Sequence, residues 1–223
     1  MHLNSKLLFE KYALKYFKSN LRVLEIGPSG FPSAYQQMIN NSEITWHTVD
    51  FEETIYIESS VNNLTYQLTA PYDFPIADEM YDIVLSGQVI EHVEKIWLWL
   101  KELKRIIKPN GYIITINPVS WPYHEAPIDC WRIFPSGIRA LAEEADLHIE
   151  KCICESLEKE QILFKDKRSQ FIPGQSYNCG LPFQKVNKQI TFNKIIRNLP
   201  ILRNFETPIE VSYDTISIMK KTI

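Results

Sequence analysis

The feature that most constrains this chain is an apolar, strand-forming segment that runs directly into a glycine-containing turn. Residues 22–26 are rich in residues that favour strands, and Gly27 and Gly30 follow closely. A buried parallel strand has this composition where it turns sharply into a loop that passes close beneath a ligand. The sequence therefore predicts an α/β fold in which a ligand lies at the end of this first strand.

Two acidic residues indicate the kind of ligand. The turn departs from G-x-G-x-x-G, which leaves room for the pyrophosphate of a dinucleotide, and Glu25 would repel a pyrophosphate but attract an ammonium group. Asp50 ends a second predicted strand at residues 43–50, where doubly wound sheets carry an acid that binds ribose hydroxyls. The two acids favour a nucleoside that carries a cationic amino acid. The alternative for Asp50 is that it caps the segment after it.

Strand and helix patterns then alternate along the chain. A strand at residues 83–85 is followed by a helical pattern that stops at Lys-Pro-Asn-Gly, and another strand covers residues 112–118. A basic residue, Pro and Gly are typical of a helix C-terminus. The alternation predicts a parallel sheet with its ligand at the carboxyl ends of the strands. The later predicted elements are a helix at residues 135–146 with Ser136 as its N-cap, and strands at residues 147–156 and 213–220.

Four motifs occur in the order found in the class I S-adenosylmethionine-dependent methyltransferases, and the chain resembles that family over about residues 21–147. They are LEIGPSG, TVD, FPIADEMYDIVLSGQVIEHV and ELKRIIKPNGYIITINP. The resemblance is to the type 11-like branch, which carries E-x-G-P-x-x-x-P and V-x-E-H-V. It implies a single domain over residues 1–223 with a Rossmann-like, doubly wound, seven-stranded and mostly parallel sheet, whose last strand is antiparallel between its neighbours.

The resemblance also implies where the cofactor, S-adenosylmethionine, binds. The residues that would hold its methionine part are those of the glycine turn, Glu25, Gly27, Pro28, Ser29 and Gly30. The residues that would contact the ribose, the adenine and the sulfonium are Asp50, Ala70, Tyr72, Ser86 and Gln88. Ala70 stands where many relatives have an acid, so adenine recognition would rest on backbone groups and a neighbouring side chain such as Tyr72.

The loop after the strand at 112–118 concentrates reactive side chains. Methyl transfer requires alignment of the nucleophile with the methyl group, and an alcohol acceptor must also lose a proton. We predict His124 as the base or as an acceptor ligand, with Asp129 and with His92 of the E-H-V motif as further catalytic candidates. The structural alternatives are a satisfied histidine at 124, an ion pair of Asp129 with Arg132, and a capping or packing role for His92.

The acceptor is predicted from the same loop. Aromatic faces combined with carboxylates often bind sugars, and the H-E-x-x-x-D-x-W-R pattern resembles methyltransferases associated with surface-polysaccharide assembly. We therefore expect O-methylation of a sugar or related polar metabolite. The alternatives are a small aromatic, quinone or amine acceptor, and a non-catalytic binding protein with this fold. No metal is expected, because His124, Glu125 and Asp129 match no defined metal spacing.

Composition narrows the partners and the location. The net charge of −3 indicates no attraction to nucleic acid. Because the chain shows neither a signal-peptide pattern nor an apolar run of membrane-spanning length, we expect a cytoplasmic protein without a membrane span.

A helix is predicted at about residues 3–19. An insertion at about residues 157–211, between the last two strands, would cover the acceptor site or join two subunits of a homodimer.

Overall fold

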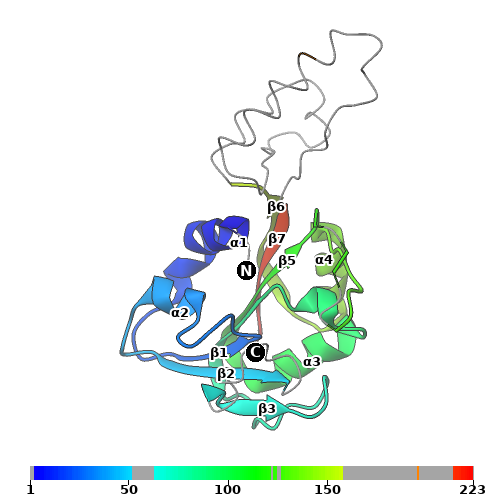
Figure 1. Ribbon diagram of the computed structural model, residues 1–223. Coiled ribbons are helices and arrows are strands. Elements are labelled where there is room, and N and C mark those ends of the chain that lie inside the picture. Colours follow the sequence, from blue (N-terminus) through cyan, green and yellow to red (C-terminus); the bar gives the residue numbers. More distant parts are fainter. Residues whose placement is uncertain are drawn as a thin grey trace.

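The computed structural model describes residues 3–51, 63–121, 123–124, 127–157, 195 and 213–222. The strands of this part form one seven-stranded sheet in the order β3-β2-β1-β4-β5-β7-β6 (Figure 1). The parallel strands are β1 (Arg22–Ile26), β2 (Thr45–Phe51), β3 (Tyr66–Leu68), β4 (Tyr81–Gly87) and β5 (Ile107–Pro118). β7 (Asp214–Lys220) is antiparallel to both of its neighbours, β5 and β6 (His148–Glu155). The predicted fold class is confirmed.

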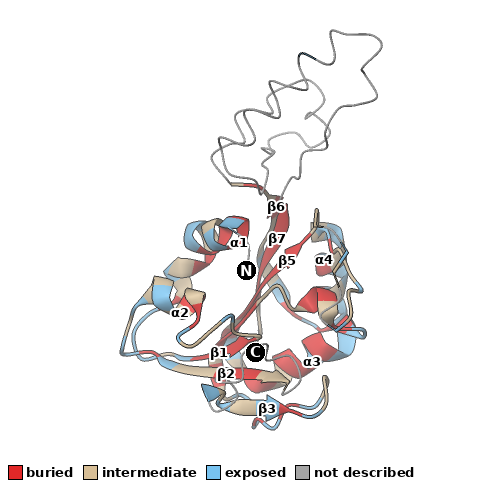
Figure 2. Cartoon of the chain, in the orientation of Figure 1, coloured by how far each residue is buried: buried red, intermediate tan, exposed pale blue. Residues whose placement is uncertain are grey.

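Helices cover both faces of the sheet (Figure 1). The first face carries α1 (Leu3–Leu8), the π-helix η1 (Phe9–Ala13), the 3-10 helix η2 (Leu14–Tyr16) and α2 (Ala34–Ile39). The second face carries α3 (Ile96–Ile106) and α4 (Pro135–Glu144). Val23 of β1 packs in the core of the first face and Leu24 in the core of the second. Alternate residues of β1 therefore serve opposite layers, as in parallel sheets buried on both sides (Figure 2).

Several local expectations need correction. Ser136 is not the N-cap of α4, because the helix begins one residue earlier at Pro135, with Phe134 in the cap position. Proline is well suited to the first helical position, since its missing N–H would be unpaired there in any case. β5 begins at Ile107, immediately after α3, and the short β3 had no strand pattern of its own. Most of the insertion predicted at about residues 157–211 lies outside the described residues.

The carboxyl ends of the parallel strands meet at one edge of the sheet. β1 lies at the centre of this edge, because it pairs with β2 on one side and with β4 on the other. In open α/β sheets, ligands bind outside the carboxyl ends at the point where the strand order reverses. The fold therefore predicts a ligand site at the turn after β1 and the end of β4. None of the helices within the described ranges is long and apolar enough to span a membrane.

Candidate active site

The turn after β1 depends on glycine. Gly27 has φ +66°, and a Cβ atom at this position would lie 2.6 Å from Cγ2 of Val89. Any other residue here would therefore strain the backbone and displace Val89. The N–H of Gly27 donates to the carbonyl of Val49 at 3.0 Å, which fixes the start of the turn beside β2. The predicted cofactor loop, which also contains Pro28, Ser29 and Gly30, thus begins at the central edge of the sheet.

Glu25 lies buried at the base of this turn, with 2% of its surface exposed. Its carboxylate accepts hydrogen bonds from the hydroxyl of Ser33 and from Nε1 of Trp46, the latter at 3.0 Å. Burial raises the pKa of Glu25 to about 7, against the opposing effect of these two hydrogen bonds. A cationic group nearby would favour the ionised form. The environment of Glu25 therefore fits the ammonium group of the methionine part.

Three side chains at the same edge present buried polar atoms that need a partner. The hydroxyl of Tyr35, Oγ of Ser86 and Oε1 of Gln88 have no hydrogen-bond partner among the described residues. The Tyr35 hydroxyl lies beside the end of β4, since a Cβ atom on Gly87 would be 2.3 Å from it. Buried polar atoms are normally paired with protein, water or ligand. This edge therefore fits a polar ligand such as S-adenosylmethionine. Ser86 and Gln88 were predicted here, and Tyr35 was missed.

The predicted nucleoside contacts follow β2 and β3. Asp50 is the second-last residue of β2, is half-buried, and accepts a hydrogen bond from the N–H of Phe51 at 2.8 Å. Ala70 follows the end of β3. The hydroxyl of Tyr72 accepts a hydrogen bond from the N–H of Lys95 at 3.0 Å, at the start of α3. Asp50 thus lies near the end of β2 and Ala70 shortly after the end of β3, and Tyr72 also supports a helix terminus.

Buried polar contacts tie α1 to this edge. Nε2 of Gln88 donates to Oγ of Ser5 at 2.9 Å and to Oδ1 of Asp214 at 3.0 Å. Nδ2 of Asn4 donates to Oδ2 of Asp214 at 2.8 Å. Asn4, Ser5 and Asp214 are fully buried. These three residues were not predicted from the sequence, because their pairing joins the first helix to the last strand and leaves no local pattern.

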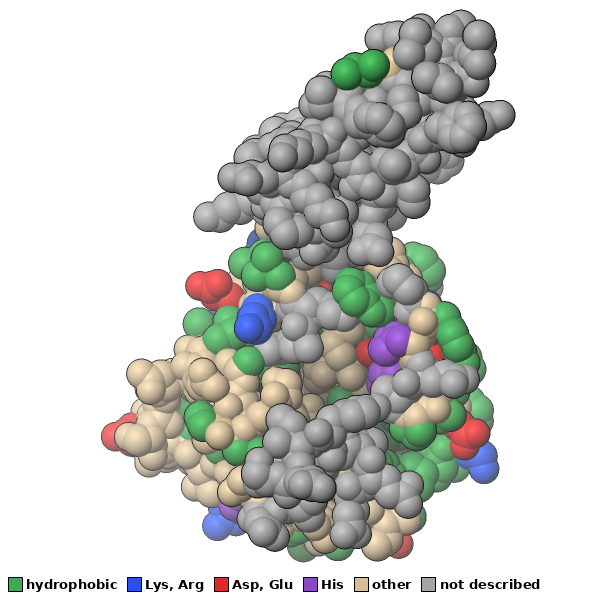
Figure 3. All heavy atoms as spheres, viewed as in Figure 1, with side chains coloured by type: hydrophobic (Ala, Val, Ile, Leu, Met, Phe, Trp, Pro, Cys, Tyr) green, Lys and Arg blue, Asp and Glu red, His purple; other side chains and the backbone are tan. Residues whose placement is uncertain are grey.

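Histidine and acidic side chains form a second group beyond the ends of β4 and β5. Figure 3 shows histidine side chains beside an acidic one at a hollow of the molecular surface. The rings of His92, in the 3-10 helix η5 (Ile90–His92), and His124 are perpendicular, with centroids 5.0 Å apart. Nδ1 of His92 contacts the carbonyl of Ile128, and its Nε2 lies 3.8 Å from Oε1 of Glu91. The structure therefore brings together two of the predicted catalytic residues.

Asp129, the third predicted catalytic residue, forms an ion pair with Arg132. Nη1 and Nη2 of Arg132 lie 2.5 and 2.6 Å from the two carboxylate oxygens, and the Asp129 side chain is 1% exposed. The hydrogen bonds from Arg132 hold the pKa of Asp129 at about 2. Asp129 also accepts a hydrogen bond from the N–H of His124 at 2.8 Å, and its Oδ2 lies 3.4 Å from Nδ1 of His124. An ionised Asp129 thus positions the histidine.

Glu91 belongs to this group but was not predicted. It is fully buried, and within the described ranges neither carboxylate oxygen has a hydrogen-bond partner. Burial raises the pKa of Glu91 to about 8. The carbonyl of Glu91 accepts a hydrogen bond from the N–H of Cys130 at 2.7 Å, which ties η5 to the loop after β5. Glu91 is the first residue of the E-H-V motif, so this motif could have indicated Glu91 as well as His92.

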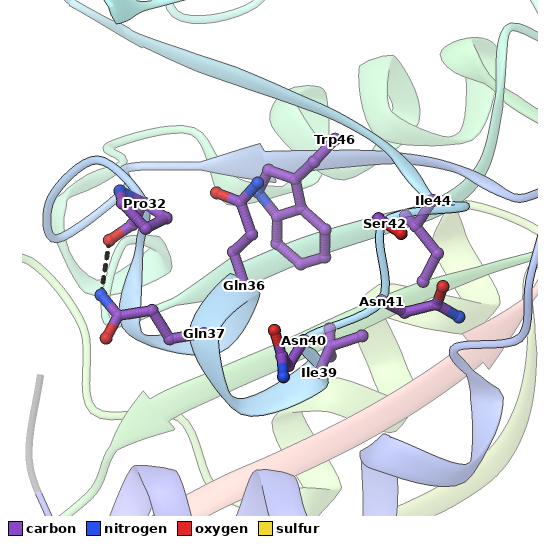
Figure 4. A pocket seen from close by; sticks show the side chains of 9 residues that line it. All are labelled: Pro32, Gln36, Gln37, Ile39, Asn40, Asn41, Ser42, Ile44 and Trp46. Carbon is purple, nitrogen blue, oxygen red and sulfur yellow. Dashed lines mark hydrogen bonds between the residues drawn. The ribbon is translucent and has the colours of Figure 1, made fainter.

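An open cavity of about 250 Å³ lies between α2 and the beginning of β2. Figure 4 shows Gln36 of α2 beside the indole of Trp46 on its wall. The described residues that line it include none of the predicted site residues. Because Trp46 also donates to Glu25, this wall is connected to the glycine turn.

Comparison with known proteins gives consistent results. A family model described as a methyltransferase domain matches residues 24–115. An uncharacterised methyltransferase of Schizosaccharomyces pombe is 32% identical over 119 residues, which cover 46% of this chain and 41% of that protein. A ubiquinone biosynthesis O-methyltransferase of Rickettsia typhi is 32% identical over 130 residues, which cover 55% of this chain and 52% of that protein. The chain thus spans about half the length of the curated relatives it matches.

A solved structure extends the likeness to nearly the whole chain. A methyltransferase from Archaeoglobus fulgidus, described as dependent on S-adenosylmethionine, superimposes with a TM-score of 0.57 at 17% identity, covering 97% of this chain and 94% of that one. At this identity the match demonstrates the shared fold. Residues 24–115 are thus similar to the methyltransferase domain family, and the chain shares the fold of a solved S-adenosylmethionine-dependent methyltransferase.

Proposed function

We propose that this protein methylates a hydroxyl group of a sugar or related polar metabolite in surface glycan synthesis. The observation that carries the proposal is the orientation of His124 by the buried, ionised Asp129, at the end of the sheet where the predicted cofactor residues lie. Bound S-adenosylmethionine supplies a methyl group made electrophilic by a positively charged sulfur. His124 would take the proton of the acceptor hydroxyl, and a positioned base of this kind typically contributes about 10²- to 10⁴-fold to the rate.

The polar character of the second group favours a polyhydroxyl acceptor. Glu91, His92 and His124 offer several hydrogen-bonding atoms, as recognition of a sugar needs. The similarity to ubiquinone biosynthesis O-methyltransferases favours a second candidate, an aromatic hydroxyl of a quinol-like acceptor. We further propose a cytoplasmic location and, through the segment at about residues 157–211, either a cover for the acceptor or a homodimer contact.

A comparison of acceptors tests the proposal. The protein would be incubated with methyl-labelled S-adenosylmethionine and either nucleotide sugars or small quinols, and the products analysed by mass spectrometry. Label on a sugar hydroxyl is expected. Label only on quinols would replace the first candidate by the second, and cofactor binding without any label transfer would favour the non-catalytic alternative.

Asp50 should contribute strongly to cofactor affinity. Asp50→Ala removes charge-assisted hydrogen bonds to the ribose, so binding of S-adenosylmethionine should weaken by roughly 1.5–3 kcal/mol, measured by calorimetric titration. Asp146→Ala is the matched control, because Asp146 is 89% exposed and lies at the end of α4. Unchanged affinity in Asp50→Ala would show that this acid does not bind the ribose.

Cofactor affinity should rise with pH because of Glu25. Its raised pKa of about 7 leaves most of the carboxyl neutral at pH 6, whereas most of it is ionised at pH 7.5. If the ionised form pairs with the ammonium group, affinity should increase roughly fivefold or more over this range. Glu25→Gln should bind more weakly and with a flat pH profile. An unchanged profile in that variant would assign the pH dependence to another group.

A further inference from the structure

Glu91, His92 and His124 form a compact set of donors. One potential ligand atom from each lies within 4.8 Å of the other two. Glu91 and His92 are neighbours in η5, and the fold brings His124, from the loop after β5, beside them. Two imidazoles and a carboxylate are a donor set that binds divalent first-row transition metals.

Each histidine is oriented through one ring nitrogen. Nδ1 of His92 contacts the carbonyl of Ile128, which leaves Nε2 facing Glu91 at 3.8 Å. Nδ1 of His124 lies 3.4 Å from Asp129, which Arg132 holds in place. Histidines that bind metals almost always make such a contact to a carbonyl or carboxylate on the nitrogen that does not ligate. The ligating atom of each ring would then be Nε2.

Glu91 provides an independent observation. Its side chain is fully buried, yet both carboxylate oxygens have no hydrogen-bond partner in the part of the chain that the structure describes. A buried carboxyl group without a partner is costly, so such a group commonly marks a missing ligand, ion or water. A cation beside Glu91 would remove this cost.

We propose that Glu91, His92 and His124 bind a divalent transition-metal ion, with Zn²⁺ and Fe²⁺ as the matching class. Three donors that bind one ion through bonds of about 2.1 Å lie roughly 3.4–3.6 Å apart, so donor atoms that are now up to 4.8 Å apart would close in by a little over an ångström. Three protein ligands leave open positions for water or an acceptor oxygen. With an ion bound, His124 would serve as its ligand instead of as the base, and the charge of the ion would lower the pKa of a bound acceptor hydroxyl, whose proton would leave to solvent.

Cobalt is a suitable probe because its visible absorption reports coordination. Tag-free protein, freed of metal by a chelator, would be titrated with Co²⁺ and then with Zn²⁺ as competitor, without cofactor or acceptor. We expect one ion per chain, and a loss of affinity of at least about tenfold in Glu91→Gln and in His92→Ala. His148→Ala is the matched control, since His148 is exposed on β6 and should leave binding unchanged.

The outcomes separate this site from the proposed methyl transfer. Absence of Co²⁺ binding by the folded protein would overturn the site, as would a Co²⁺ affinity in the folded variants equal to that of the wild type, with folding checked by circular dichroism. If one of the two variants fails to fold, the other still tests the metal site. The titration involves no methyl transfer, so its result stands whether or not the proposed reaction does. Turnover should fall when a chelator removes the metal and should return when the ion is added back. Turnover that the chelator leaves unchanged would contradict the catalytic part of the inference.

Discussion

His124→Ala is expected to lower turnover by about 10²-fold or more while the affinity for S-adenosylmethionine stays within a few-fold. His124 lies beyond the ends of β4 and β5, whereas the glycine turn and Asp50 lie at the ends of β1 and β2. The variant therefore removes the proposed proton acceptor and leaves the predicted cofactor residues in place. Single-turnover methyl transfer and calorimetric titration measure the two quantities separately.

His148→Ala again provides the control, because it removes an exposed histidine of β6. It should leave both turnover and cofactor affinity unchanged. Full activity in His124→Ala would mean that alignment alone drives the transfer, with His92 the next candidate. The chelator experiment decides whether His124 acts directly or through a metal ion, since a large effect of the substitution is expected in both cases.

The largest loss of stability is expected from Arg132→Ala. The variant leaves Asp129, a side chain that is 1% exposed, without the guanidinium that contacts both of its oxygens. The pair is part-buried and Asp129 keeps the hydrogen bond from the N–H of His124, so the loss should be about 1–3 kcal/mol, below the cost of breaking a fully buried pair. The free energy of unfolding, measured by urea denaturation at pH 7, should fall by this amount.

The pKa shift of Asp129 predicts how the loss of stability in Arg132→Ala should change with pH. The pKa of Asp129 is lowered from 3.8 to about 2 in the folded protein, so the contribution of the pair is present above pH 4 and is lost as the pH falls towards 2. The difference between wild type and Arg132→Ala should therefore shrink in acid. Lys101→Ala, which removes an exposed ion pair with Glu144 at 2.6 Å, should not shift the denaturation midpoint. Equal midpoints for both variants would contradict the structural role of Arg132.

The sheet could be predicted because its central strands carry strong local patterns. β1 and β4 are apolar runs that end at glycine or small polar residues, and such runs specify buried parallel strands almost alone. The same patterns located the glycine turn and the acid at the end of β2. β3 has only three residues and Ser136 resembles many N-caps, so the first was missed and the second misassigned.

The second group could be predicted only in part, because it depends on contacts between distant segments. The loop composition indicated His124 and Asp129, and the E-H-V motif indicated His92, but nothing local showed that Glu91 would lie beside them. The partners of Gln88 are likewise Ser5 and Asp214, near opposite ends of the chain. Contacts between residues so far apart in the chain leave no local spacing pattern, so they cannot be predicted from a single sequence.

Transfer of a labelled methyl group tests the central claim most directly. Wild-type protein would be incubated with methyl-labelled S-adenosylmethionine and a panel of nucleotide sugars, with His124→Ala in parallel. The account predicts one labelled methyl group on a sugar hydroxyl, formed by the wild type at least about 10² times faster than by the variant. Tight cofactor binding with no label on any hydroxyl acceptor, sugar or quinol, would contradict it.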